Sequence, residues 1–124
     1  MTTKRILIID DEPAILRIAQ LGLRIGQGWN SQTTTSGMEG LSLAASEHPD
    51  AILLDVMMPE FDGFSILAQL QANPETAQIP VIFLTAKAQA ADRRRFYEAG
   101  VAGVIIKPFD PTTLASQIAG FLAW

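Results

Sequence analysis

Short runs of consecutive apolar residues, separated by stretches with helical periodicity, restrict the fold of this chain more than any other feature. Four such runs are clear, at residues 6–9, 52–54, 81–84 and 104–106. Strands that are apolar on both sides must be covered on both faces, as in a parallel sheet flanked by helices. Residues 30–34 are polar but rich in β-branched threonine, so we expect a fifth strand at the sheet edge. The sequence therefore predicts an α/β fold.

One helix is predicted after each strand. After Pro13, which suits the first turn of a helix, apolar residues recur at the spacing of one helix face: Ala14, Ile18, Leu21 and Ile25. The other predicted helices span residues 40–47, 64–71, 89–99 and 112–122. Asp110 is placed to cap the last of these helices, and Pro111 is placed in its first turn.

Length and composition fit one globular domain that spans residues 1–124. Hydrophobic residues make up 48% of the chain and charged residues 18%, which argues against disorder. No apolar run approaches the roughly 20 residues of a membrane-crossing helix, and the N-terminus lacks the apolar core of a secretory signal. We therefore expect a cytoplasmic protein that does not bind membranes. The absence of cysteine excludes thiolate metal sites, and the net charge of -4 argues against direct binding of nucleic acid.

Polar side chains follow the predicted strands at their carboxyl ends. They are Asp10 and Asp11 after the first strand, Asp55 after the third, Thr85 after the fourth and Lys107 after the fifth. These strand ends meet at one edge of an open parallel sheet, where ligands bind. Two like charges about 4 Å apart repel by roughly 4 kcal/mol at an effective dielectric of about 20. Three carboxylates must therefore protonate, recruit the lysine or bind a hard cation, and we expect Mg²⁺, with Mn²⁺ as an alternative.

A cation held by two or three carboxylates keeps coordination positions open for phosphate oxygens. Lys107 and Thr85 can bind the remaining oxygens of a phosphoryl group. A carboxylate can serve as the nucleophile and form an acyl phosphate. Asp55 is the expected nucleophile, because Asp10 and Asp11 are better occupied with the metal. The strand ends therefore predict a phosphoryl-transfer site.

Four motifs in this order resemble the markers of the response-regulator receiver domain of two-component signalling: "IIDDEP", "LLDVMMPEFDG", "IFLTAKA" and "IIKPF". The resemblance covers essentially the whole chain. It implies a doubly wound, flavodoxin-like sheet of five parallel strands in the order 2-1-3-4-5, with five helices. It also implies that Asp55 accepts a phosphoryl group from a histidine kinase or a histidine phosphotransfer protein, and that the protein is not a turnover enzyme.

The resemblance also implies roles for the other residues of the site. The metal ligands would be Asp10, Asp11, Asp55 and the backbone carbonyl of Met57. Thr85 would donate a hydrogen bond to the phosphoryl group, and Lys107 would pair with it. The Lys107–Pro108 peptide bond is expected to be cis. An output protein would bind the face formed by helix 89–99, strand 104–106 and helix 112–122.

Two positions depart from the usual receiver pattern. Val104 stands where the family usually has an aromatic ring that turns inward on phosphorylation, so we expect output by another route. Met57 stands where the family often has a polar side chain that orients the attacking water, so we expect slow hydrolysis of the acyl phosphate. Glu12 is expected mainly to favour the positive N-terminus of the first helix. The pair Asp62 and Gly63 is interpreted as a turn and a helix start.

The sequence also bears on three other functions. A haloacid-dehalogenase-type phosphatase also uses a strand-end Asp, but its first motif is Asp-x-Asp, and Glu12 stands two residues after Asp10. A flavodoxin-type flavin carrier needs a phosphate loop rich in Ser, Thr and Gly, where this chain has "DDEPA". The departure at Val104 keeps open a degenerate receiver that binds partners without phosphate.

Overall fold

A computed structural model describes residues 3–58, 62–86 and 89–124, so motif residues 59–61 and 87–88 lie outside the described residues. Its strands are β1 Arg5–Ile9, β2 Asn30–Thr34, β3 Ala51–Asp55, β4 Val81–Thr85 and β5 Gly103–Ile106. Its helices are α1 Pro13–Gln27, α2 Gly37–Glu47, α3 Gly63–Ala72, α4 Ala90–Ala99 and α5 Leu114–Leu122. All strand pairs are parallel and their order is β2-β1-β3-β4-β5, which confirms the predicted fold and the edge position of β2.

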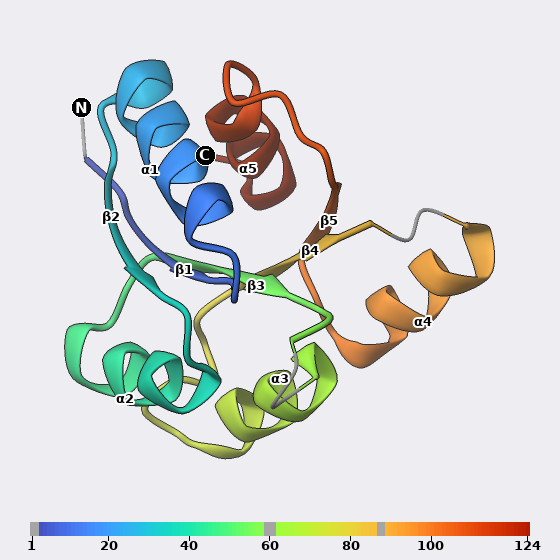
Figure 1. Cartoon of the computed structure of the whole chain (residues 1–124). Coiled ribbons are helices and arrows are strands. Elements are labelled where there is room, and N and C mark those ends of the chain that lie inside the picture. The colour runs from blue at the N-terminus through green and yellow to red at the C-terminus, as the bar shows by residue number, and fades with distance from the viewer. Residues whose placement is uncertain (1–2, 59–61, 87–88) are drawn as a thin grey trace.

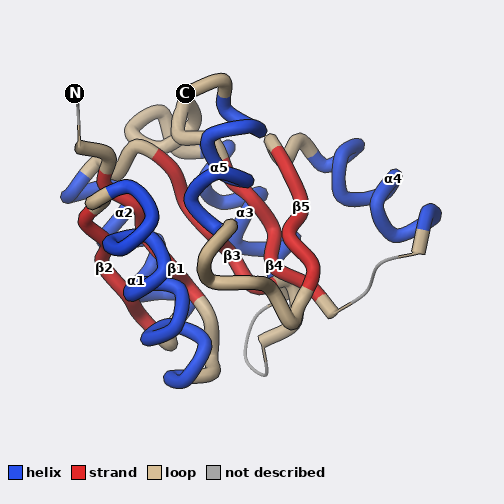
Figure 2. The backbone as a smooth tube through the Cα atoms, turned by 90° about the horizontal axis from the view of Figure 1, so that it is seen from above, coloured by secondary structure: helices blue, strands red, loops and turns tan. Residues whose placement is uncertain are grey.

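Two apolar cores lie on the two faces of the sheet. Helices α1 and α5 cover one face, and α2, α3 and α4 cover the other (Figures 1 and 2). The first core includes Ile8, Leu53, Leu23 and Ile118. The second includes Leu7, Leu54, Ile66 and Phe96. Successive side chains of one strand point to opposite faces, and both faces are buried, which explains the continuous apolar runs.

Helix α1 confirms the predicted helix but buries a different face from the one that the apolar spacing indicates. Its buried residues are Leu16, Ala19, Gly22 and Leu23. The prediction placed Ile18, Leu21 and Ile25 on the buried face. They lie on the outer surface instead, with exposed fractions of 43%, 57% and 74%. The buried face contains small residues because α1 packs closely against the segment that precedes α5. A Cβ atom on Gly22 would lie 2.6 Å from the carbonyl oxygen of Pro111.

Helix α5 begins later than predicted. Thr113 is its N-cap, and Pro111 lies in the preceding turn rather than in the first turn of the helix. The Asp110 carboxylate accepts hydrogen bonds from the backbone N–H (2.9 Å) and hydroxyl (2.7 Å) of Thr112, so it stabilises that turn instead of capping α5. These bonds lower the pKa of Asp110. Among the helices within the described ranges, none has the length and hydrophobicity that crossing a bilayer requires.

Candidate functional site

The carboxyl ends of four parallel strands position the predicted site residues. Asp10 follows β1 directly, β3 ends at Asp55, β4 ends at Thr85, and Lys107 follows β5. Strand register aligns these ends, because Ile9 pairs with Leu54, Asp55 with Leu84 and Thr85 with Ile106. The backbone N–H of Lys107 donates to the carbonyl of Thr85 at 2.8 Å. Residues far apart in the sequence therefore meet at one edge of the sheet.

Among the described residues, a close group of three carboxylates lies at this edge. Asp10, Asp11 and Asp55 each offer one oxygen, and the three oxygens lie within 4.8 Å of one another. Asp10 is fully buried, and Asp55 is 4% exposed. The backbone N–H of Glu12 donates to Asp10 Oδ1 at 2.9 Å, and that of Met57 donates to Asp55 Oδ1 at 3.2 Å. Each of the two buried carboxylates is therefore oriented by the backbone that follows it.

The Lys107 ammonium lies among the acids. Its Nζ atom is 2.6 Å from Asp10 Oδ2, 3.4 Å from Glu12 Oε1 and 3.5 Å from Asp55 Oδ2. The lysine side chain is 13% exposed, so these interactions form at the margin of the buried region. The Lys107–Pro108 peptide bond is cis, as predicted. In this state the lysine lies closer to Asp10 than to Asp55.

Burial raises the pKa of two acids of the site, and the Lys107 ammonium offsets this only in part. Burial raises the pKa of Asp10 above the ordinary 3.8, and the hydrogen bond from Lys107 opposes this only in part. Burial and then the charge of Asp10 raise the pKa of Asp55 from 3.8 to about 6. Burial lowers the pKa of Lys107, but its hydrogen bond with Asp10 and the nearby negative charges outweigh this, so the pKa lies above 10.5. Negative charge is therefore costly in this cluster, and a bound cation would relieve that cost.

The donor set suits a hard divalent cation. Carboxylate oxygens are the ligands that Mg²⁺ and Mn²⁺ prefer, and three of them converge here. Met57, whose carbonyl is the fourth predicted ligand, lies two residues after Asp55 and forms an isolated antiparallel bridge with Asp62. The Met57 residue is 61% exposed. The predicted ligands thus lie on two adjacent segments at the sheet edge.

One known protein family matches the sequence of this chain. The model of the response regulator receiver domain matches residues 6–119. The chain belongs to the response-regulator receiver domain family. This membership places it in two-component signalling, in which receivers pair with histidine kinases, and it argues against the phosphatase and the flavin carrier. Receiver domains are in general phosphoacceptors rather than turnover enzymes.

Individual relatives agree with the family. The DNA-binding dual master transcriptional regulator RpaA of Synechocystis is 37% identical over 118 residues, which are 95% of this receiver and 48% of RpaA. The receiver spans about half the length of the curated relatives it matches. The chemotaxis response regulator CheY4 of Vibrio cholerae has a TM-score of 0.89 at 26% identity, covering 97% of this receiver and 99% of that chain. The BeF3-activated DrrB receiver domain has a TM-score of 0.82 at 26% identity, covering 99% and 100%.

Gly63 lies beside the receiver site, although the sequence indicated it only as part of a turn and a helix start, which α3 confirms. A Cβ atom on Gly63 would lie 2.7 Å from Val56 Cα and 2.9 Å from the Asp55 carbonyl oxygen. The Gly63 N–H donates to the Val56 carbonyl at 2.7 Å, and Asp62 caps α3 by accepting from the Ser65 N–H at 2.7 Å. The absence of a side chain at Gly63 therefore lets α3 begin against the backbone that carries Asp55.

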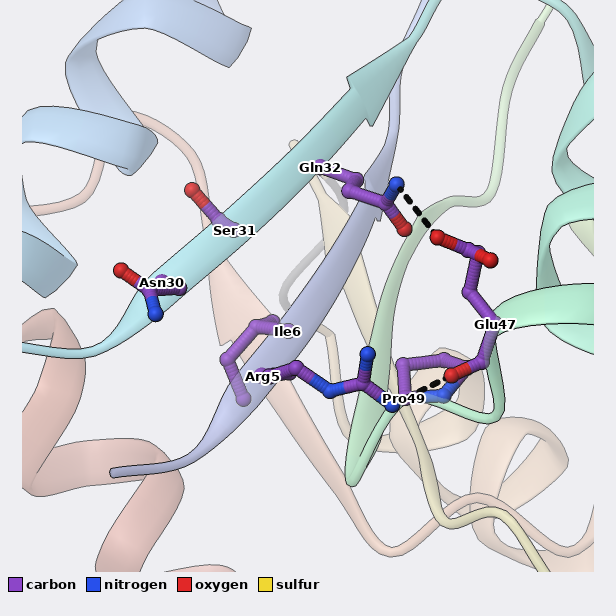
Figure 3. A pocket seen from close by; sticks show the side chains of 7 residues that line it. All are labelled: Arg5, Ile6, Asn30, Ser31, Gln32, Glu47 and Pro49. Carbon is purple, nitrogen blue, oxygen red and sulfur yellow. Dashed lines mark hydrogen bonds between the residues drawn. The ribbon is translucent and has the colours of Figure 1, made fainter.

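A small pocket elsewhere on the receiver is separate from this chemistry. It has a volume of about 170 Å³ and lies at the amino-terminal ends of β1 and β2, the opposite edge of the sheet (Figure 3). There the Arg5 guanidinium donates to the carbonyls of Glu47 and His48, and the Gln32 amide donates to the Glu47 carboxylate at 3.3 Å. These bonds connect the end of α2 to the sheet, so we interpret the pocket as a packing feature.

Proposed function

We propose that residues 1–124 form one phosphoacceptor domain in which Asp55 takes a phosphoryl group from a phosphohistidine in a Mg²⁺-dependent reaction. The observation that carries this proposal is the position of the buried Asp55 carboxylate. It lies in a group of three acids whose oxygens are within 4.8 Å, and 3.5 Å from the Lys107 ammonium. Such a site can bind a cation through its carboxylates and an anion through its ammonium.

The chemistry follows from the proposed roles. With a pKa of about 6, Asp55 is mainly ionised at neutral pH and can act as a nucleophile. Its carboxylate oxygen attacks phosphorus, the P–N bond of the phosphohistidine breaks, and the electron pair stays on the imidazole nitrogen. A bound Mg²⁺ or Mn²⁺ would neutralise charge on the phosphoryl oxygens, with Asp10, Asp11, Asp55 and the Met57 carbonyl as its ligands. Lys107 and the Thr85 hydroxyl would hold the remaining oxygens.

The outer surface of α1 supports docking of the donor protein. The helix begins at the strand-end site, directly after its N-cap Glu12. Its outward residues Ile18, Leu21 and Ile25 form an exposed apolar stripe. The charged residues of α1 are Arg17 and Arg24, which line a groove of about 540 Å³ between α1 and β2. A donor helix with an apolar face and acidic flanks fits this surface.

We propose that the output partner binds the face of α4, β5 and α5. Phe96 is the buried residue of α4, whereas Arg93 and Arg94 are exposed and Tyr97 is 47% exposed. Neither β5 nor α5 contains a charged side chain, so the charge of this face comes from α4. Val104 is partly buried against the core under α4 and supplies no ring. We therefore assign the readout to a shift of α4 itself.

RpaA is described as DNA-binding, but this chain matches only 48% of its length. We propose that the receiver itself does not contact nucleic acid and that it acts in the cytoplasm without binding membranes. The alternative is a phosphate-independent interaction module, and Val104 at the usual aromatic position is the observation that favours it.

Labelling with a small acyl phosphate donor tests the proposed function. The native protein, Asp55→Asn and a control Asp92→Asn on α4 are incubated with the donor and Mg²⁺, and intact mass is measured. We expect one phosphoryl group on the native protein and on the control, none on Asp55→Asn, and none after chelation of the metal. Labelling of Asp55→Asn would assign the acceptor elsewhere. Absence of label on folded native protein would favour the phosphate-independent module.

A further inference from the structure

The side chain of Glu12 contacts Lys107 as well as standing at a helix end. Glu12 is the N-cap residue of α1, but its carboxylate makes no capping hydrogen bond. Its Oε1 atom instead accepts a hydrogen bond from the Lys107 ammonium at 3.4 Å, although the two residues are 95 positions apart. The Glu12 side chain is 61% exposed, so this contact lies on the solvent side of Lys107.

The other partners of Lys107 lie deeper. Asp10 is fully buried and Asp55 is nearly so, at 2.6 Å and 3.5 Å from the ammonium. An ammonium has three N–H donors, and here three carboxylates share them. A phosphoryl group on Asp55 would need some of these donors. Glu12 is the partner that Lys107 can give up most readily, because an exposed carboxylate regains water when its ion pair breaks.

We propose that Glu12 is a positioning residue that holds Lys107 in its resting location and competes with a phosphoryl group on Asp55 for the ammonium. This inference rests on the proposed function of Asp55. It assigns to Glu12 a brake on phosphorylation, because its ion pair must break before Lys107 can turn fully toward the phosphoryl oxygens. The backbone N–H of Glu12, which holds Asp10, is retained in any variant except proline.

Two substitutions separate positioning from simple charge repulsion. Glu12→Gln removes the charge and keeps the shape of the side chain. Glu12→Asp keeps the charge but shortens the side chain, so the carboxylate no longer reaches Lys107. Glu98→Gln, on the exposed end of α4, removes the same charge away from the site. The probe is beryllofluoride, the group on the similar activated DrrB receiver domain, with affinity measured by NMR titration at saturating Mg²⁺.

Both Glu12 variants are expected to bind beryllofluoride more tightly than native protein, by up to about five-fold, the range of an exposed ion pair. Their rates of labelling by the small donor should rise by a similar factor, and Glu98→Gln should match native protein in both. Unchanged or weaker binding by Glu12→Gln would overturn the inference. Native behaviour of Glu12→Asp would also overturn it, because charge repulsion alone would then explain the effect.

The native protein and Asp55→Asn in the same titration separate this inference from the proposed function. If native protein binds beryllofluoride, Asp55→Asn does not, and the Glu12 variants match native protein, the positioning role alone fails. If native protein neither binds the probe nor takes up label, both fail.

Discussion

Replacing Asp55 by Asn is expected to stabilise the metal-free protein at pH 8, although it removes the proposed phosphoacceptor. Asp55 is 4% exposed and lies close to Asp10 and Asp11. Its Oδ1 atom accepts a hydrogen bond from the Met57 N–H at 3.2 Å, and an Asn amide oxygen can accept the same bond. The substitution therefore removes mainly a buried negative charge from a group of like charges.

The pKa of Asp55 sets the magnitude. Burial and the charge of Asp10 raise it from 3.8 to about 6. One pKa unit corresponds to about 1.4 kcal/mol, so keeping this carboxylate charged in the folded protein costs about 3 kcal/mol. The folded protein binds this proton more tightly than the unfolded chain, so stability is lost as pH rises from about 4 to 6 and then levels off. Asp55→Asn should raise the unfolding free energy by about 2 to 3 kcal/mol at pH 8 and by almost nothing at pH 4.

Urea unfolding with a chelator present measures this difference. Trp29 is 6% exposed, so its fluorescence reports loss of the core. Glu98→Gln is the control, because it removes an exposed charge of the same sign. Saturating Mg²⁺ should stabilise native protein more than Asp55→Asn and reduce the advantage of the variant. A gain that is absent at pH 8, or equal at both pH values, would show that the carboxylate is not held charged among other acids.

Three further results are expected. Gly63→Ala should destabilise the protein by about 1 to 3 kcal/mol and slow labelling of Asp55, because its Cβ would press on the backbone that carries the acceptor. The control Gly120→Ala, whose Cβ meets open space, should cause neither effect, and equal destabilisation of the two variants in calorimetry would contradict this prediction. Met57→Asn should speed loss of the phosphoryl group, and a native lifetime of seconds would contradict the predicted slow hydrolysis. Ile18→Asp should reduce the rate of phosphoryl transfer from a cognate phosphodonor protein by at least about five-fold and leave the rate of labelling by the small donor unchanged. A parallel loss of both rates would place Ile18 outside the docking surface.

The sequence predicted the strands and the chemical groups at their ends because both follow from local patterns. A run such as residues 52–54 is apolar at every position only if both faces of its strand are covered. Once the strands are parallel, residues directly after them must lie at one edge of the sheet. This is why the sequence alone predicts Asp10, Asp55 and Lys107 at one edge. The cis bond before Pro108 was predicted from the family resemblance alone.

Packing between distant elements decided the features that the sequence left ambiguous. Helix α1 has two apolar stripes of suitable period, and the close contact of Gly22 with Pro111 selects the one that is buried. The partners of Lys107 also depend on two separate strand ends. Their register and side-chain geometry bring the ammonium to 2.6 Å from Asp10 and allow Glu12 to reach it. Local sequence thus determined the fold and the groups at its edge, whereas long-range packing decided which of those groups touch.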